Sequence, residues 1–341
     1  MPDEPVLAVD EIQGNVIPGF NTRHQVLLGV RFDSAPAAAE GRAWLRAVVA
    51  SISSLREVNA VRDERRAAAL QGAGRPTSPV LTNVAFDIGG LRLLAPAADR
   101  IRDRSFRLGM GLESDLGDPQ DPAHPGHPGQ WVVGGRPDVA PHALVVLGGD
   151  DLDDLRRHVD HVREAGGRLV YEEEGHMLDG DIEHFGFRDG VSQVGVRGRL
   201  PGGMYLTRRY LDPGDPRADR LARPGQPLVW PGQFVFGYPK QRADDPVRPG
   251  PVATGGHDWM DDGSYLAFRR LRQDVAAFRR FVAEEAARIP GMSAERLAAL
   301  VVGRWPRGTP VMRNPASDDE TADSGHDRFA VNDFSYGDDP L

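Results

Sequence analysis

The stretch from His142 to Tyr171, HALVVLGGDDLDDLRRHVDHVREAGGRLVY, decides the expected fold of the first half of the chain. Its opening residues, 142–147, form an apolar run that is typical of a buried strand. The acids at 150–154 can cap a helix and interact favourably with its N-terminal dipole. Gly166-Gly167 is expected to end that helix at about residue 165, and a further strand begins at Arg168. The stretch therefore predicts a strand, a helix and a second strand.

The residues before this stretch show the same alternation. Apolar runs at 24–32 and 80–88 predict two strands, and the apolar face of 37–52 predicts a helix between them. A short helix is expected around 91–94. The resulting order, strand, helix, strand, strand, helix, strand, is the split βαβ or ferredoxin-like pattern. We therefore predict an α+β fold in which residues 1–195 form a ferredoxin-like domain.

The second half begins the same pattern without finishing it. Strands are expected at 233–238 and 264–271, and helices at 273–289 and 293–302. From about residue 305 the chain is rich in Pro, Gly, Asp and Asn, which predicts an irregular tail. A second ferredoxin-like unit would need another strand, a helix and a last strand. Residues 196–341 are therefore expected to form the first part of an incomplete second ferredoxin-like domain, with an open sheet edge and an exposed apolar face.

Composition excludes several classes of protein. The 341 residues contain 50 acids and 41 bases, and a net charge of −9 disfavours a nucleic-acid partner. No apolar run approaches the ~18 residues of a membrane span. The N-terminal residues 1–5 do not resemble a secretory signal, so we expect a cytoplasmic protein with no membrane partner. Because the chain has no cysteine, disulfides, thiolate nucleophiles and iron–sulfur clusters are excluded.

The most informative candidate for chemistry is the stretch 183–193, EHFGFRDGVSQ. Asp189 lies between Gly186 and Gly190, so its carboxylate is expected on a tight backbone segment that approaches another group closely. The alternative is a simple turn, because Asp-Gly pairs are common turn residues. Histidine pairs spaced by three occur elsewhere, but no third ligand accompanies them, so we expect no metal ion held by protein ligands alone.

Five motifs, in order along the chain, resemble those of the dye-decolorizing peroxidases, a family of haem peroxidases. The pentapeptide 186–190 matches their GxxDG signature. The other four are Ile12-Gln13-Gly14-Asn15-Val16, the strand-like 231–238 (PGQFVFGY), 262–274 (DGSYLAFRRLRQD), and Gly303-Arg304-Trp305 with Gly308-Thr309-Pro310. The resemblance implies a fold of two ferredoxin-like domains, haem b as cofactor, and hydrogen peroxide and an organic reductant as substrates.

The resemblance also implies roles for individual residues. Asp189 corresponds to the distal carboxylate of the family, which transfers a proton between the two oxygens of peroxide. The residues expected to contact the cofactor are Gly186, Phe187, Arg188, Gly190, Ser192 and Gln193.

The axial histidine and the distal arginine of the family have no matching position in this sequence. His326 is close to where the histidine segment is expected, but it occupies what the family uses as a linker. The resemblance therefore implies haem shared with a second polypeptide that completes the C-terminal domain. Two alternatives stay open, namely a non-catalytic scaffold or binding subunit that does not hold haem alone, and a truncated single-chain peroxidase.

Arg269 and Arg270 fall in the expected strand 264–271, where successive side chains point to opposite faces. We expect both to be structural, because in the family the distal arginine follows a later segment.

Overall fold

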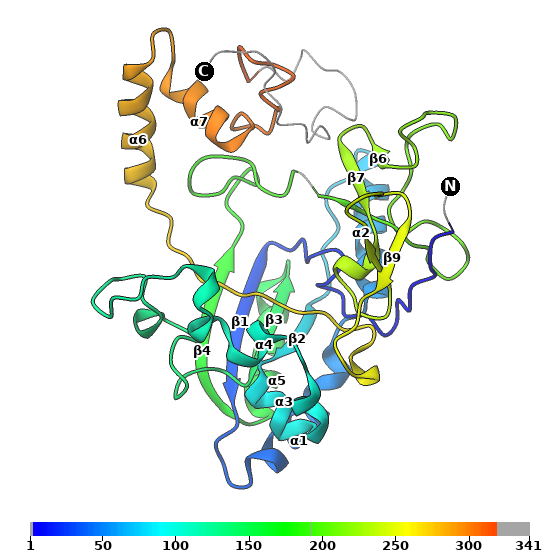
Figure 1. Ribbon diagram of the computed structural model, residues 1–341, viewed down its shortest axis with the longest axis vertical. Helices are drawn as coiled ribbons and strands as arrows, with labels where there is room; N and C mark the ends of the chain where they lie inside the picture. The colour runs from blue at the N-terminus through cyan, green and yellow to red at the C-terminus, as the bar shows by residue number, and fades with distance from the viewer. Residues whose placement is uncertain (1–2, 192, 319–341) are drawn as a thin grey trace.

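The computed structural model describes residues 3–191 and 193–318. Its largest sheet contains β1 (His24–Arg31), β2 (Leu81–Phe86), β3 (Ala143–Gly149) and β4 (Arg168–His176). The strands are antiparallel and lie in the order β2-β3-β1-β4 (Figure 1). This order and the intervening helices are those of a ferredoxin-like unit, so the expected fold of the first half is confirmed.

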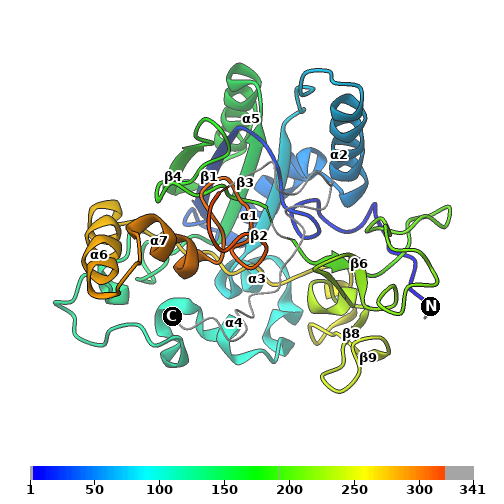
Figure 2. The same cartoon turned by 90° about the horizontal axis from the view of Figure 1, so that it is seen from above.

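Two helices, α1 (Ala37–Val48) and α5 (Leu152–Glu164), cover one face of this sheet (Figure 2). Alternate strand residues such as Val26, Leu28 and Val145 point toward them and are buried. Trp44 of α1 is fully buried. The inward-facing side chains of the strands and the apolar faces of the two helices therefore pack together in one hydrophobic core.

Sequence reasoning missed the long helix α2 (Leu55–Leu70). Ser54 caps it by accepting a hydrogen bond from the backbone of Glu57, and the Glu57 side chain accepts one from the backbone of Ser54 in return. This reciprocal arrangement is a capping box, and the spacing Ser-x-x-Glu is its sequence signature. The signal was therefore present at residues 54–57.

The rest of the chain forms short elements around these. The further helices are α3 (Ile88–Leu94), α4 (Arg104–Leu108), α6 (Val275–Arg288) and α7 (Ala294–Val302). A three-stranded sheet contains β5 (Gly195–Val196), β6 (Leu221–Arg223) and β7 (Gln226–Val229), and a two-stranded one contains β8 (Pro239–Gln241) and β9 (Pro249–Val252). Short 3₁₀ turns span Val49–Ser51, Pro96–Arg100, Met110–Leu112, Ser114–Leu116, Pro128–Gln130, Pro231–Gln233 and Asp258–Met260.

Helices α6 and α7 confirm the two helices expected in the second half, but the two expected strands are wrong. Residues 233–238 begin in a 3₁₀ turn and Gly237 has a φ of +86°, so the chain folds back there and the strand β8 starts only at Pro239. Residues 264–271 do not form a strand, because no backbone ladder joins them to any strand in the described part of the chain. A strand needs a ladder partner, and the apolar pattern alone does not supply one.

A buried ion cluster joins the N-terminal segment to the second half. The Glu4 carboxylate accepts hydrogen bonds from Arg197 (3.1 Å), from Arg209 (2.8 Å) and from the backbone of Gly198 (2.8 Å). Glu4 and Arg197 are almost completely buried. Apolar residues extend this junction, because Leu7 and Ile12 pack in one cluster with Val196, Val235 and Tyr238.

Candidate functional site

The stretch 183–190, which we call the carboxylate loop, is closed by the side chain of Glu183. Its two carboxylate oxygens accept the backbone N–H groups of Phe185 (2.9 Å) and Phe187 (3.0 Å). The backbone of Glu183 adds a further bond by donating to the Phe187 carbonyl. Burial alone would raise the pKa of Glu183, but these amide donors and the side-chain amide of Gln273 outweigh it and hold the pKa below its usual value.

Two glycines give the carboxylate loop its backbone shape. Gly186 has a φ of +101° and Gly190 a φ of +67°, both in the left-handed region that glycine adopts without strain. A Cβ atom at either position would meet no atom within 4 Å. The glycines are therefore required by conformation, and the space next to them is open.

Asp189 lies on the exposed side of this loop. Its backbone N–H donates to the carbonyl of Asp181 (2.9 Å), and its own Oδ1 accepts the N–H of Gly190 (2.6 Å). Among the described residues, no other group donates a hydrogen bond to this carboxylate. Its backbone is therefore fixed while one carboxylate oxygen faces solvent, which suits a group that exchanges protons with a bound molecule.

The other side of the loop packs on the second half of the chain. Phe187 is 6% exposed and lies in a cluster with Val282 of α6 and Ala298 of α7. Phe185 stacks on Phe278 with ring centroids 4.7 Å apart. The backbone N–H of Arg188 donates to the Pro306 carbonyl (2.9 Å). The loop that carries Asp189 is therefore supported by α6, α7 and the segment after them.

The structure thus brings five of the expected site residues together, namely Gly186, Phe187, Arg188, Asp189 and Gly190. Arg188 places its guanidinium 3.9 Å from the carboxylate of Asp181. Gln193 has an exposed side chain, and its backbone carbonyl accepts a hydrogen bond from Gln226 (2.9 Å). Ser192 lies outside the described residues. Because Phe187 points into the protein, only its backbone is available to a molecule on the open side of the loop.

Arg269 and Arg270 point to opposite sides, as their alternation predicts. Arg269 bonds to Asp118 (2.9 Å) and lies over the ring of Trp131. Arg270 bonds to Glu173 of β4 (3.2 Å). Both arginines are therefore engaged in holding the 264–272 stretch against other parts of the chain.

Sequence reasoning did not foresee a large cavity of about 1290 Å³. Its walls come from β2, α3, the loops at 103–119 and 125–142, and the stretch 265–272. Most of the lining is apolar, including Phe86, Phe106, Trp131 and Phe268. The carboxylate loop does not line it. The cavity depends on segments distant in sequence, so no local signal announces it.

Asp87 and His142 are among the titratable side chains in the wall of this cavity. Burial raises the pKa of Asp87, whose carboxylate caps α3 by accepting the Gly90 N–H (2.6 Å). Burial lowers the pKa of His142, whose Nδ1 accepts the N–H of Phe32 (3.1 Å). Both groups therefore have structural partners in the first domain.

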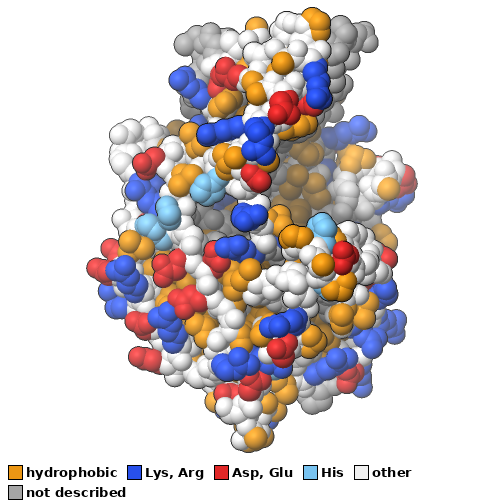
Figure 3. Space-filling model, turned by 90° about the vertical axis from the view of Figure 1, so that its left-hand side faces the viewer, with side chains coloured by type: hydrophobic (Ala, Val, Ile, Leu, Met, Phe, Trp, Pro, Cys, Tyr) orange, Lys and Arg blue, Asp and Glu red, His pale blue; other side chains and the backbone are white. Residues whose placement is uncertain are grey.

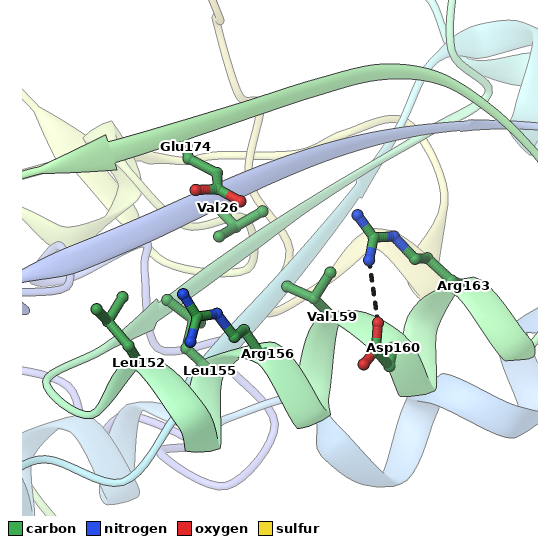
Figure 4. A pocket seen from close by; sticks show the side chains of 8 residues that line it. All are labelled: Val26, Leu152, Leu155, Arg156, Val159, Asp160, Arg163 and Glu174. Atoms are coloured by element: carbon green, nitrogen blue, oxygen red, sulfur yellow. Dashed lines mark hydrogen bonds and ion pairs between the residues drawn. The ribbon is translucent and has the colours of Figure 1, made fainter.

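A smaller groove of about 290 Å³ lies between α5 and the strands β1 and β4 (Figure 4). Arg163 and Asp160 line it and bond to each other on one face of the helix (3.0 Å). Asp189 does not line this groove, and the charged residues of the groove are those of an ordinary exposed helix face.

In the described part of the chain, no helix is both long and apolar enough to cross a membrane.

The sequence of this chain is similar to those of dye-decolorizing peroxidases. The chain is 28% identical over 342 residues to the dye-decolorizing peroxidase msp1 of Mycetinis scorodonius, covering 96% of this chain and 57% of that protein. It is 31% identical over 251 residues to a dye-decolorizing peroxidase of Mycena epipterygia, covering 67% and 41%. No family model matches the chain.

Solved structures agree with the sequence comparison. An ancestral D-type dye-decolorizing peroxidase superposes with a TM-score of 0.70 at 25% identity, covering 96% of this chain and 64% of that one. A dye-decolorizing peroxidase from Auricularia auricula-judae gives a TM-score of 0.68 and shares the fold. The chain therefore matches msp1 and the two solved structures over nearly its whole length. It spans only about half the length of the curated relatives.

Proposed function

Because this chain's homologues and structural neighbours are dye-decolorizing peroxidases, we propose that it is one subunit of a split haem peroxidase of that family. A second polypeptide would complete the C-terminal domain and supply the axial histidine, for which this sequence has no matching position. The two chains together would use hydrogen peroxide to oxidise an organic reductant. The observation that carries the proposal is the exposed carboxylate of Asp189 on a backbone loop held by several hydrogen bonds.

The carboxylate loop fits one face of a haem. The open space beside Gly186 and Gly190 would let a flat macrocycle approach the backbone closely. Gly186, Arg188 and Gly190 would line that approach, with Gln193 following, and the buried Phe187 would hold the loop from behind. Bound haem would supply the redox chemistry that breaks the O–O bond of peroxide.

Within this arrangement Asp189 moves a proton. Its carboxylate accepts the proton from one oxygen of hydrogen peroxide and then donates it to the other, which leaves as water. The same group thus acts first as base and then as acid, and it ends the step ionised as it began. Its Oδ1 is held by the Gly190 amide, which leaves the second oxygen to make the transfer. A cation near the leaving oxygen would come from the partner chain.

The test uses the complex that co-purifies with this chain from its native source. A Soret absorption band and peroxide-dependent oxidation of a dye are expected. Asp189→Asn keeps the shape of the side chain and removes the base, so the rate of peroxide cleavage should fall by about 10²- to 10⁴-fold with haem content unchanged. Asp179→Asn makes the same change at another exposed position nearby and should leave the rate unchanged.

A loss of less than about threefold in the Asp189 variant would mean that another group transfers the proton. A complex that forms without haem would instead support the second candidate, a non-catalytic scaffold subunit. That candidate is kept because the axial histidine of the family has no matching position in this chain. Loss of haem in the Asp189 variant alone would assign Asp189 to a structural turn.

A further inference from the structure

The segment 118–130 repeats a pattern of three residues. A proline stands at every third position, and the residue before each proline is an acid or a histidine. These pairs are Asp118-Pro119, Asp121-Pro122, His124-Pro125 and His127-Pro128. Residues 121–130 form three consecutive turns, which we call the proline spiral. Each turn is closed by the same bond, in which the N–H of residue 124, 127 or 130 donates to the carbonyl three residues earlier (2.9, 2.9 and 2.8 Å).

The proline spiral lies on the surface of the molecule. Figure 1 shows this part of the chain in teal, projecting at the left, and Figure 3 faces that side, where basic and acidic side chains are interspersed. Residues 121–125 are exposed, and His127 is half-buried. Protons from the solvent therefore reach both histidines of the spiral.

The first residue of each turn caps that turn with its side chain. In all three turns the side chain accepts the backbone N–H two residues later. The bonds run to Oδ1 of Asp121 from Ala123 (2.9 Å), to Nδ1 of His124 from Gly126 (3.0 Å) and to Nδ1 of His127 from Gly129 (3.0 Å). An imidazole nitrogen accepts a hydrogen bond only through a free lone pair. Each histidine cap therefore requires the neutral ring with its proton on Nε2.

The proline spiral forms part of the wall of the cavity of about 1290 Å³. Pro125, Gly126 and Trp131 line the cavity. The indole N–H of Trp131 donates to the carbonyl of Gly126 (3.0 Å). The side-chain amide of Gln130 donates to the carbonyl of Pro122 (3.0 Å) and so joins the last turn to the first. A change in the turns would therefore be transmitted to Trp131 in the cavity wall.

Arg269 holds the chain at both ends of the proline spiral. It bonds to Asp118 before the spiral (2.9 Å), and its guanidinium lies over the ring of Trp131 after it, 5.0 Å from the ring centre. Between these two points the turns are held by their own bonds and caps. The spiral is therefore a strap with fixed ends, and its middle depends on the side-chain caps.

The charged groups around the two histidines are few. On the described elements beside the proline spiral they are Asp118 and Asp121 of the same segment, Arg269, and Arg104 with Glu113 and Asp115 next to the turn Met110–Leu112. Both arginines are paired with acids. Residues 131–135, which pack against the last turn, carry no charge. Proton uptake by the histidines is therefore not opposed by an unpaired cation on these elements.

We propose that the proline spiral is a pH-sensitive strap on the wall of the cavity. While His124 and His127 are neutral, their Nδ1 atoms hold two of the three turns closed. A proton that binds Nδ1 occupies the lone pair that accepts the N–H of Gly126 or Gly129, so each protonation removes one cap. Histidine ordinarily changes charge between about pH 5 and 8. The strap is therefore closed above this range and loosened below it, independently of Asp189.

The tautomer of the two histidines is the first test. Nitrogen-15 NMR of the imidazole rings at about pH 7.5 should show the proton of His124 and His127 on Nε2, with Nδ1 unprotonated. A proton on Nδ1 of both rings at this pH would overturn the proposal, because neither cap could form.

Hydrogen exchange measures the caps themselves. Between about pH 7.5 and 5.5, the protection factors of the Gly126 and Gly129 amides, corrected for the intrinsic pH dependence of exchange, should fall by about 2- to 10-fold. The indole N–H of Trp131 should lose protection with them, because its acceptor is the Gly126 carbonyl. The Ala123 amide is the internal reference, since its cap is a carboxylate and aspartates ordinarily titrate near pH ~4. Constant protection of the two glycines would overturn the proposal.

Asparagine variants separate the cap from its titration. A chain with both His124→Asn and His127→Asn keeps a side-chain oxygen that can accept the same N–H groups but cannot titrate. It should show the protection of the closed strap at both pH values. His176→Asn removes an exposed histidine outside the proline spiral and should leave the pH dependence as it is in the wild type. A double variant that retains the full pH dependence would show that another group causes it, which would refute the assignment to these two histidines.

Discussion

The side-chain amide of Gln273 donates a hydrogen bond of 2.6 Å to the carboxylate of Glu183, across ninety residues of sequence. Gln273 lies just before α6, and Glu183 closes the loop that carries Asp189. The bond therefore links the segment before α6 with the loop of the proposed proton-transfer group. Removal of this bond should increase the mobility of the carboxylate loop more than that of any other part of the chain.

Gln273→Ala should loosen the carboxylate loop. Glu183 would keep its bonds to the backbone of Phe185 and Phe187 but lose its side-chain donor. A hydrogen bond of this kind contributes about 0.5–1.5 kcal/mol, so exchange of the Phe187 and Asp189 amides should speed up by about 2- to 10-fold. Gln71→Ala, at an exposed glutamine after α2, is the control and should change neither rate. Equal rates in the Gln273 variant would show that this bond does not restrain the loop.

Gly186→Ala should destabilise the protein by about 1–2 kcal/mol, because an alanine at a φ of +101° is strained even where space is open. Gly74→Ala provides the comparison, since Gly74 also has open space but lies outside the positive-φ region. That substitution should be neutral or stabilise slightly by restricting the unfolded chain. Urea unfolding of both variants measures the difference, and similar stabilities would contradict a conformational role for Gly186.

Glu4→Gln should cost about 3–5 kcal/mol of unfolding free energy, since it leaves the guanidinium groups of Arg197 and Arg209 buried without their counter-charge. The structure of the N-terminal segment should loosen first, because Glu4 is its link to the second half. Glu11→Gln, at an exposed acid of the same segment, should cost less than about 0.5 kcal/mol. A Glu4 variant as stable as the Glu11 variant would show that the cluster is not needed for folding.

His142 should make stability depend on pH. Its pKa is lowered by burial in the folded chain and is about 6.5 in the unfolded chain, so the unfolded state takes up a proton first as the pH falls. The contribution is therefore present above pH 6.5 and declines as the pH falls toward the folded-state pKa. His142→Asn retains an acceptor for the Phe32 amide and does not titrate, so wild type should lose stability relative to it between pH 7.5 and 5.5. A constant difference measured by urea unfolding would refute this.

The first domain was accessible from sequence because its signals are local. Strand alternation at residues 24–32 and 142–147 and the acids before α5 each point to the same core, and the structure agrees with them. Helix α2 was missed although Ser54 and Glu57 carry a capping signature. Most of its residues are charged or small, so the apolar periodicity of its buried face is weak.

Non-local features were not accessible in the same way. The side chains of Arg269 and Arg270 alternate as a strand predicts, yet whether that strand has a partner depends on residues far away in sequence. The cavity beside it depends likewise on loops that converge from separate regions. For the site, the motif located Asp189 and its glycines. It gave no indication that Phe187 would turn inward or that Glu183 would close the loop.

Strand β1 lies at the centre of the first sheet, and His24 at its start pairs with both Gly149 of β3 and His176 of β4. Both neighbours are made long after β1 during synthesis on the ribosome, so the nascent chain carries an apolar strand with no ladder until β3 has emerged. We therefore expect the four-stranded sheet to close only after β4 has emerged from the ribosome. Slowing translation once β4 has emerged from the ribosome should raise the yield of folded protein more than slowing it once β2 has emerged.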